Sequence, residues 1–150
     1  MPRPSLTRAS DTGAARGSRF EVGCVTGRTL LDVTQDDSER FAEAWLAAWN
    51  AHDLDAILEH YDEDVVFSSP FAVEFAGRDD GTLHGKDELR AYFERALQAF
   101  PDLAFRGLEV RAGATSVCLL YRSVRDLLAA ETMVLDEAGR VVRVYAHYGD

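Results

Sequence analysis

The sequence predicts one α+β domain, in which helices pack on the concave side of a curved antiparallel sheet. Residues 39–61 and 86–100 carry apolar side chains at helical spacing, whereas the segments from residue 103 onward have strand length and are separated by turn residues. Helices followed by a run of strands are typical of the α+β class. The chain has 150 residues, of which 47% are hydrophobic, and this suits one domain with a core of its own.

The first predicted helix has an aromatic face. Asp36 to Ser38 favour a helix N-cap, and Asp53 is placed to cap a second, short amphipathic helix. Apolar residues recur at intervals of three and four in both helices, at Phe41, Trp45, Ala48 and Trp49 in the first and at Leu54, Ile57, Leu58 and Tyr61 in the second. The two helices therefore predict one wall of a hydrophobic cup.

The remaining elements follow from turn signals and periodicity. An acidic turn leads into a strand at residues 65–69, which Pro70 ends, and residues 72–83 are expected to form a surface loop near the mouth of the cup. A helix is predicted over residues 86–100, because acidic residues occupy its first turn and Pro101 follows its end. The later strands are expected at residues 103–111, 116–124, 129–135 and 141–148.

The net charge of −10 narrows the classes of partner. A chain this acidic would repel nucleic acid and anionic membrane surfaces, which leaves a small apolar or weakly polar molecule as the expected partner.

Residues 1–37 are expected to be a flexible or weakly ordered extension and residues 38–150 the folded domain, because the first part has few apolar side chains. No apolar run reaches the roughly 20 residues of a membrane span, and no signal-peptide core is present, so the cytoplasm is expected.

The sequence contains no pattern for a metal or cofactor site. Cys24 and Cys118 lie in unrelated contexts, and no two histidines have metal-ligand spacing. Glycine motifs of phosphate loops, dinucleotide sites and nucleophile elbows are absent from the sequence. Neither a metal nor an organic cofactor is therefore expected.

Three phrases carry a family resemblance: WLAAWNAHDLDAILEHYDEDVVFSSPF, LHGKDELRAYFERAL and DEAGRVVRVYAHY. In them the chain resembles the nuclear transport factor 2-like superfamily, in particular its SnoaL-like and ketosteroid-isomerase-like branches, over residues 39–148. The resemblance implies a cone-shaped NTF2-like fold. It also implies homodimerisation through the convex sheet face, toward which His147 is expected to point. Because this fold hosts both enzymes and binding domains, the fold is implied more specifically than the function.

The site of the isomerase branch can be compared position by position. Its proton-shuttling aspartate falls on Ser69, before Pro70-Phe71, and its oxyanion-hole tyrosine falls on Trp45. Its protonated aspartate corresponds to Glu131. Isomerisation by that route needs both carboxyl groups. Since only one is retained, this chain is not expected to use that route.

Glu131 is the candidate catalytic residue. Alternation places it with Ala129 and Met133 on a strand face suited to burial, where the pKa of its carboxyl group would be raised. Two interpretations are open. Glu131 is either an acid in a pocket or the partner of Arg122 or Arg143 in a structural ion pair.

The candidate ligand-binding residues are mostly aromatic. The resemblance and the strand alternation place a pocket among Trp45, Trp49, Tyr61, Phe67, Ser69, Phe71, Phe93, Tyr121, Met133 and Tyr148. Rings at helical spacing are also what a plain core contains. The sequence thus predicts a small-molecule-binding domain with a largely apolar pocket. It leaves open whether this domain is also a cofactor-independent enzyme of the isomerase, cyclase or hydrolase type. The alternative is a non-catalytic ligand-binding or homodimerisation module.

Overall fold

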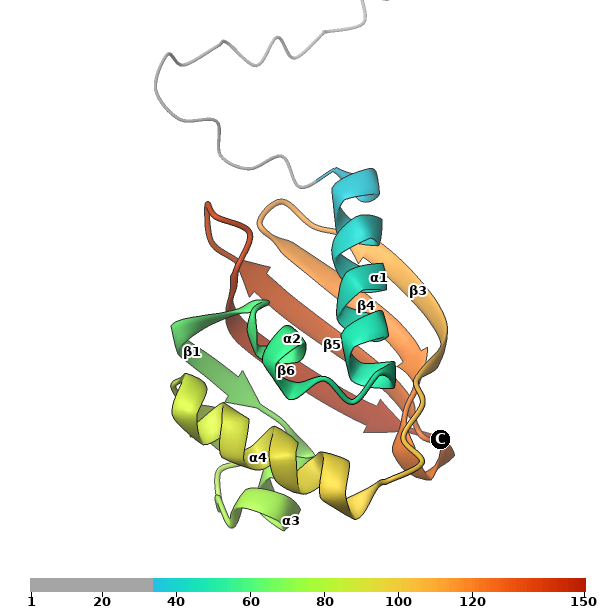
Figure 1. The fold of residues 1–150 in the computed structure, drawn as a ribbon. Coiled ribbons are helices and arrows are strands. Elements are labelled where there is room, and N and C mark those ends of the chain that lie inside the picture. Colours follow the sequence, from blue (N-terminus) through green and yellow to red (C-terminus); the bar gives the residue numbers. More distant parts are fainter. Residues whose placement is uncertain (1–33) are drawn as a thin grey trace, which may run out of the picture.

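Six strands form one curved sheet with the order β2-β1-β6-β5-β4-β3 (Figure 1). The computed structural model describes residues 34–150. The strands are β1 (Tyr61–Ser68), β2 (Thr82–His84), β3 (Arg106–Ala112), β4 (Ser116–Arg122), β5 (Leu128–Leu135) and β6 (Val141–Gly149). All neighbouring strands are antiparallel except β1 and β6, which run parallel. The sheet is therefore mixed, and the prediction of a purely antiparallel sheet is wrong at this pair.

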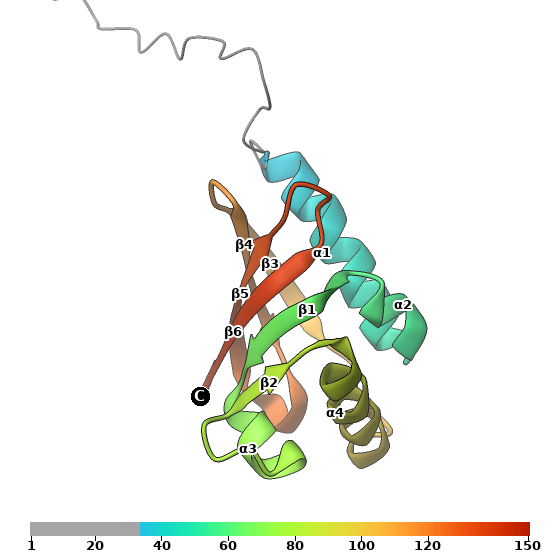
Figure 2. The ribbon, with the colours of Figure 1, turned by 90° about the vertical axis from the view of Figure 1, so that its left-hand side faces the viewer.

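The helices lie together on one side of this sheet (Figure 2). They are α1 (Gln35–Asn50), α2 (Leu54–Leu58) and α4 (Lys86–Ala99), while α3 (Pro70–Ala76) packs beside α4 and the strands β2 and β6. A short 3-10 turn, η1 (Val124–Asp126), joins β4 to β5. The predicted α+β class, with helices on the concave side of a curved sheet, is confirmed. No helix among residues 34–150 is long and apolar enough to cross a membrane.

Helix α1 begins earlier than the sequence indicated. The side chain of Thr34, and not one of residues 36–38, caps the helix by accepting a hydrogen bond from the backbone N–H of Asp37 at 3.1 Å. Gln35 to Asp37 thus form the first helical turn. Helix α1 thus extends three residues into the segment expected to be a flexible extension, and the rest of that segment, residues 1–33, lies outside the described residues.

Helix α3 replaces part of the surface loop expected at residues 72–83. Ser69 caps it, its hydroxyl accepting a hydrogen bond from the N–H of Phe71 at 3.2 Å, and Pro70 occupies the first helical position. Gly77 ends the helix with a φ of 65°, in the left-handed region that glycine adopts at low cost. The chain then pairs with β1 as β2, so the connection is ordered by backbone hydrogen bonds.

The predicted acidic turn at residues 62–64 is part of a strand. Strand β1 starts at Tyr61 and includes these residues, with an irregularity in its pairing to β6 between Tyr61 and Val66. Such an irregularity lets the exposed carboxylates of Glu63 and Asp64 reach solvent while the strand continues. Tyr61 consequently enters the core from a strand and not from a helix.

The inner face of the central strands supplies the floor of the core. The pairing registers place Leu119, Glu131 and Ala146 side by side, and Tyr121, Ala129 and Tyr148 form the adjacent row. All but Glu131 and the half-buried Tyr148 belong to the buried hydrophobic set of the protein. A carboxyl group therefore interrupts an otherwise apolar surface.

Candidate functional site

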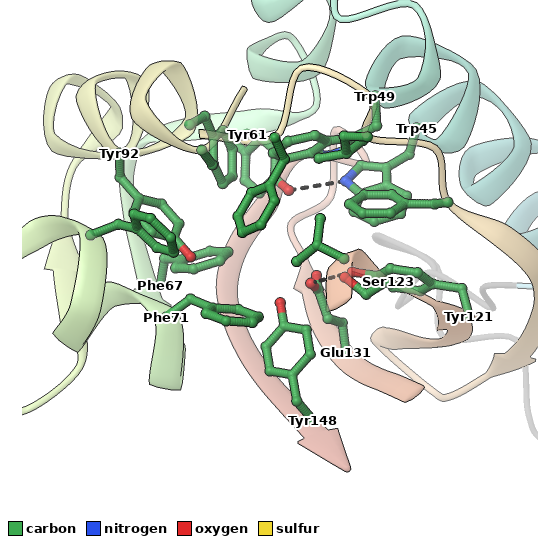
Figure 3. Close-up of a pocket in the computed structure, with 17 residues that line it drawn as sticks. Trp45, Trp49, Tyr61, Phe67, Phe71, Tyr92, Tyr121, Ser123, Glu131 and Tyr148 are labelled. Carbon is green, nitrogen blue, oxygen red and sulfur yellow. Dashed lines mark hydrogen bonds between the residues drawn. The ribbon is translucent and has the colours of Figure 1, made fainter. Parts of the chain in front are cut away.

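A cavity lies between this sheet face and the helices, and 17 residues line it (Figure 3). Most of them are aromatic: Trp45, Trp49, Tyr61, Phe67, Phe71, Phe75, Tyr92, Phe93, Phe100, Phe105, Tyr121 and Tyr148. The others are Ala96, Leu103, Ser123, Val124 and Glu131. The lining is thus apolar in bulk, with a few hydroxyl groups and one carboxyl group.

The cavity is narrow. The empty space among the lining side chains and at the mouth is about 490 Å³, but only about 40 Å³ of it admits the centre of a water molecule. A single water needs roughly 10–15 Å³ by the second measure. The room for a ligand is described by the volume of about 40 Å³, because the volume of about 490 Å³ includes open solvent. In this conformation the cavity has space for a few waters, and a larger molecule requires lining side chains to move.

Glu131 supplies the carboxyl group of the cavity. Its side chain projects from β5 and only 4% of the residue is exposed. The hydroxyl of Tyr121 donates a hydrogen bond to Oε1 at 2.7 Å, whereas Oε2 has no hydrogen-bond partner among the described residues. Burial raises the pKa of Glu131 to about 7, although the hydrogen bond from Tyr121 acts in the opposite direction. The carboxyl group is therefore poised to gain or lose a proton near neutral pH.

The structure excludes the ion pairs considered for Glu131. The Arg122 guanidinium lies near Asp126, with 3.6 Å between Nε and Oδ1. Arg143 donates to the hydroxyl of Tyr145 at 3.0 Å on the exposed surface. Glu131 thus has a tyrosine as its partner in place of a cation, and its charge is left uncompensated when it ionises.

Three further tyrosines bring hydroxyl groups to the cavity. The hydroxyls of Tyr92 and Tyr148 point into it (Figure 3), and burial raises the pKa of both side chains. Burial also raises the pKa of Tyr61, whose hydroxyl accepts a hydrogen bond from Nε1 of Trp45 at 3.0 Å. These phenols stay protonated at neutral pH. They can donate hydrogen bonds to a ligand, whereas Nε1 of Trp45 already donates to the hydroxyl of Tyr61.

Stacked rings hold the wall opposite the sheet. Phe105 stacks on Trp45 with 5.8 Å between ring centroids, and Trp49 meets Phe93 edge-to-face at 4.7 Å. Nε1 of Trp49 is buried without a hydrogen-bond partner in the described part of the chain. A buried N–H of this kind is costly unless something accepts from it, so Trp49 is a second unsatisfied polar group on the cavity lining.

Most of the predicted pocket residues line the cavity, and two of them lie outside its lining. The cavity lining contains Glu131 and every predicted aromatic residue, but not Ser69 or Met133. Met133 is fully buried in the core. Ser69 caps α3, and its hydroxyl also interacts with the phenols of Tyr92 and Tyr148, which tends to lower the pKa of each. Whether the lining residues bind a ligand stays a prediction.

Sequence reasoning missed several lining residues. Tyr92, Ala96 and Phe100 lie on the apolar face of the predicted helix at 86–100, so periodicity was a usable signal for them. Phe75 was hidden in the expected loop. The others, Leu103, Phe105, Ser123 and Val124, fall within the strands expected at residues 103–111 and 116–124, but β3 starts only at Arg106 and β4 ends at Arg122, so these four lie in connections.

His147, the residue expected to point toward the convex face, lies away from the cavity. It is exposed on the outer sheet face, with Nδ1 3.2 Å from the carbonyl oxygen of Ala130. Among residues 34–150, no cluster of His, Cys, Asp and Glu side chains is arranged to hold a metal ion.

Comparison with known proteins agrees with this architecture. The family model for SnoaL-like domains matches residues 42–148. A SnoaL-like protein of unknown function from Burkholderia thailandensis is 42% identical, with a TM-score of 0.76 over 79% of this chain and 98% of that chain. An NTF2-like protein from Anabaena variabilis is 15% identical, with a TM-score of 0.61 over 81% of this chain and 96% of that one.

A protein with a reported enzymatic role has the same fold. It is an epoxide hydrolase/cyclase-like enzyme with a role in pyran ring formation in the polyether salinomycin, and it is 18% identical to this chain. Its TM-score is 0.57, over 76% of this chain and 92% of that chain. At this identity the likeness concerns the fold alone. No curated protein matches the sequence.

Proposed function

This chain belongs to the SnoaL-like domain family, and on that premise we propose that it binds a small, largely apolar molecule in the aromatic cavity and exchanges a proton with it through Glu131. The observation that carries the proposal is the state of that carboxyl group. It is buried, its pKa is about 7, and one of its oxygens faces the cavity lining without a partner. A general acid or base works best when its pKa lies near the working pH.

The surrounding groups fit the same function. The rings exclude water and supply apolar contact area, while the phenols of Tyr92 and Tyr148 are neutral donors for a carbonyl, hydroxyl or ether oxygen of the ligand. Ser69 is a helix cap and brings no second carboxyl group. A one-carboxyl proton transfer without a cofactor suits steps of the isomerase, cyclase or hydrolase type.

Ligand entry requires the narrow cavity to open. Phe71, Phe75 and Phe100 are only partly buried, and they belong to α3 and to the end of α4, at the rim of the cavity. Rotation of these rings would widen the cavity without breaking a backbone hydrogen bond. Binding then depends on how much apolar contact the ligand provides in return.

A thermal-shift screen against steroid-like, polyketide-like and fatty-acid-like molecules tests the proposal. A ligand that binds the folded state raises the melting temperature by mass action. We expect hits for the native chain and weaker shifts for Glu131→Gln with those hits that carry an oxygen function. Turnover of any hit should be lost in Glu131→Gln while the circular dichroism spectrum is unchanged.

A second variant sharpens this test. Tyr121→Phe removes the hydrogen bond that lowers the pKa of Glu131, so the pH profile of turnover should move to higher pH. Full turnover by Glu131→Gln would remove its role as acid or base. An absence of shifts across all three ligand classes would contradict ligand binding itself.

A non-catalytic function is the second candidate. The cavity volume of about 40 Å³ favours it, because a cavity so small resembles imperfect core packing. The outer sheet face also favours it, since Leu120, Leu128 and Tyr145 are exposed there and could bury against a second copy of the chain. In that case the cavity would bind a ligand without turnover, or the domain would serve as a homodimerisation module.

A further inference from the structure

A wider groove adjoins the cavity. This groove has a volume of about 400 Å³, against about 40 Å³ for the cavity by the same measure. Four residues line both hollows: Phe100, Leu103, Ser123 and Val124. The site is thus a small aromatic chamber with an outer vestibule, and a molecule longer than the chamber would extend into the vestibule.

Arg125 lies at the junction of the two hollows. Its guanidinium carbon is 5.3 Å, 5.9 Å and 5.6 Å from the ring centroids of Phe71, Phe75 and Phe100, all of which line the chamber. Arg125 itself lines the vestibule. Of the described residues, it is the only Lys or Arg that lines either hollow. A cation is therefore held against the aromatic rim in a protein whose net charge is −10.

The backbone at Arg125 is unusual. Arg125 and Asp126 have φ values of 56° and 57°, in the left-handed region that residues other than glycine rarely adopt. Such conformations are concentrated at functional sites. The turn η1 thus presents the Arg125 side chain to the rim at the expense of local backbone strain.

Glu74 holds the guanidinium in place. Its two carboxylate oxygens accept from Nη1 and Nη2 of Arg125 at 3.0 Å and 2.6 Å. Both side chains are nearly half exposed, at 47% and 48%, so solvent weakens the attraction between them. The fork of the guanidinium fits a carboxylate in this two-oxygen manner. Another oxyanion at the same place would satisfy the same donors.

We propose that the ligand of this site carries a carboxylate-like anion, which Arg125 binds at the vestibule while the apolar body of the ligand occupies the chamber. The inference rests on the proposed function. Glu74 is then a stand-in for the ligand anion, which replaces it without leaving the guanidinium unpaired. The ionised form of Glu131 repels an anion, so the charged end of the ligand stays outside and its neutral end meets Glu131. Asp102 also lines the vestibule and disfavours anions that do not reach Arg125.

A matched pair of probes tests this assignment. Para-butylbenzoate and para-butylbenzamide have nearly the same size and shape, but only the first is charged at pH 8. The chain has two tryptophans, Trp45 and Trp49, and both line the chamber, so tryptophan fluorescence reports its occupancy directly. We expect the native chain to bind the benzoate about tenfold more tightly than the benzamide, since the bidentate contact is charge-assisted.

Two variants should change this preference in opposite directions. Arg125→Gln should bring the ratio of the two affinities close to one, and Glu74→Gln should raise it roughly threefold, because it removes a competing carboxylate from an exposed pair. Benzamide binding should stay the same in both. Arg111→Gln is the control for Arg125→Gln, because it also removes one positive charge. It breaks the exposed pair with Glu109 on β3 and should leave the ratio of benzoate to benzamide affinity unaltered.

The possible outcomes separate this inference from the proposed function. If the benzoate preference survives in Arg125→Gln, or if Glu74→Gln lowers it as Arg125→Gln does, Arg125 does not recognise the anion. If both probes bind equally to the native chain, the chamber binds ligands, but the proposal that Arg125 binds an anion is wrong. If neither probe binds, the ligand-binding function itself is contradicted, and the inference is lost with it.

Discussion

A carboxyl group buried as fully as that of Glu131 holds a proton more tightly in the folded protein than in the unfolded chain. With a folded-state pKa of about 7 and an ordinary value of 4.5, the folded state carries the extra proton between these two pH values. The extra proton on Glu131 therefore stabilises the folded state fully below pH 4.5. This contribution to the free energy of unfolding is lost as the pH rises through 7. The total change is about 3 kcal/mol.

The Glu131→Gln variant isolates this contribution. His60, whose pKa burial lowers, changes stability in the opposite sense, but it does so equally in both proteins. Because Gln keeps an oxygen for the Tyr121 hydroxyl and cannot ionise, we expect near-equal stabilities at pH 5 and a variant more stable by about 2–3 kcal/mol at pH 8. Urea unfolding at both pH values measures this. Parallel pH dependences of the two proteins would show that Glu131 ionises freely in the folded state.

At the scale of elements, helix α1 positions the wall that covers the cavity. The side-chain amide of Asn50 donates to the carbonyl oxygen of Phe105 at 3.1 Å and accepts from its N–H at 2.7 Å. Asn50→Ala removes both bonds from a connection that carries two lining residues, Leu103 and Phe105. We expect a loss of about 1–3 kcal/mol in urea unfolding, together with a change in tryptophan emission because Phe105 stacks on Trp45.

Asn50→Asp is the matched control for this prediction. It keeps an acceptor for the N–H of Phe105, but it loses the donor and adds a negative charge at the C-terminal end of α1, so its stability should fall below that of the native chain. Equal losses in the two variants would mean that the N–H bond contributes little. An unchanged Asn50→Ala would show that packing alone holds the connection.

The elements also show what a sequence can indicate. Helices α1 and α4 were predictable because their apolar spacing is long and regular. Helix α3 was not, although Ser69-Pro70 and Gly77 are start and stop signals for a helix. Pro70 also ends a strand, and seven residues are too few for periodicity to favour one interpretation. The aromatic part of the site was therefore predictable, whereas the vestibule, which depends on turns such as η1, was not.

At the scale of the whole molecule, the sheet order depends on contacts between the two ends of the domain. Strand β1 pairs in parallel with β6, so Phe67 lies opposite Val144, a residue about half the chain length away in the sequence. Parallel strands need a long crossover, and here the elements from α3 to β5 supply it. Local patterns gave the strands at the end of the chain but carry no information about this pairing. The resemblance implied the cone-shaped fold, and the structure adds the direction of each strand.

The outer face of the same sheet leads to a prediction about assembly. Leu120 lies beside Ala130, which in turn pairs with His147, and Tyr145 lies beside Thr132, so exposed apolar side chains occur on three neighbouring strands, at Leu120 on β4, Leu128 on β5 and Tyr145 on β6. Apolar side chains grouped on one sheet face are typical of a protein–protein contact. We expect light scattering after size-exclusion chromatography to give twice the chain mass of 16.6 kDa.

Leu120→Glu should return the mass to that of one chain, because it would bury a carboxylate at the centre of the interface. Gln98→Glu adds the same charge on the exposed side of α4 and should leave the dimer intact. A native chain that stays monomeric at tens of micromolar would contradict the interface. A dimer that survives Leu120→Glu would place the contact elsewhere on the molecule, and the outer sheet face would then need another partner to explain its exposed side chains.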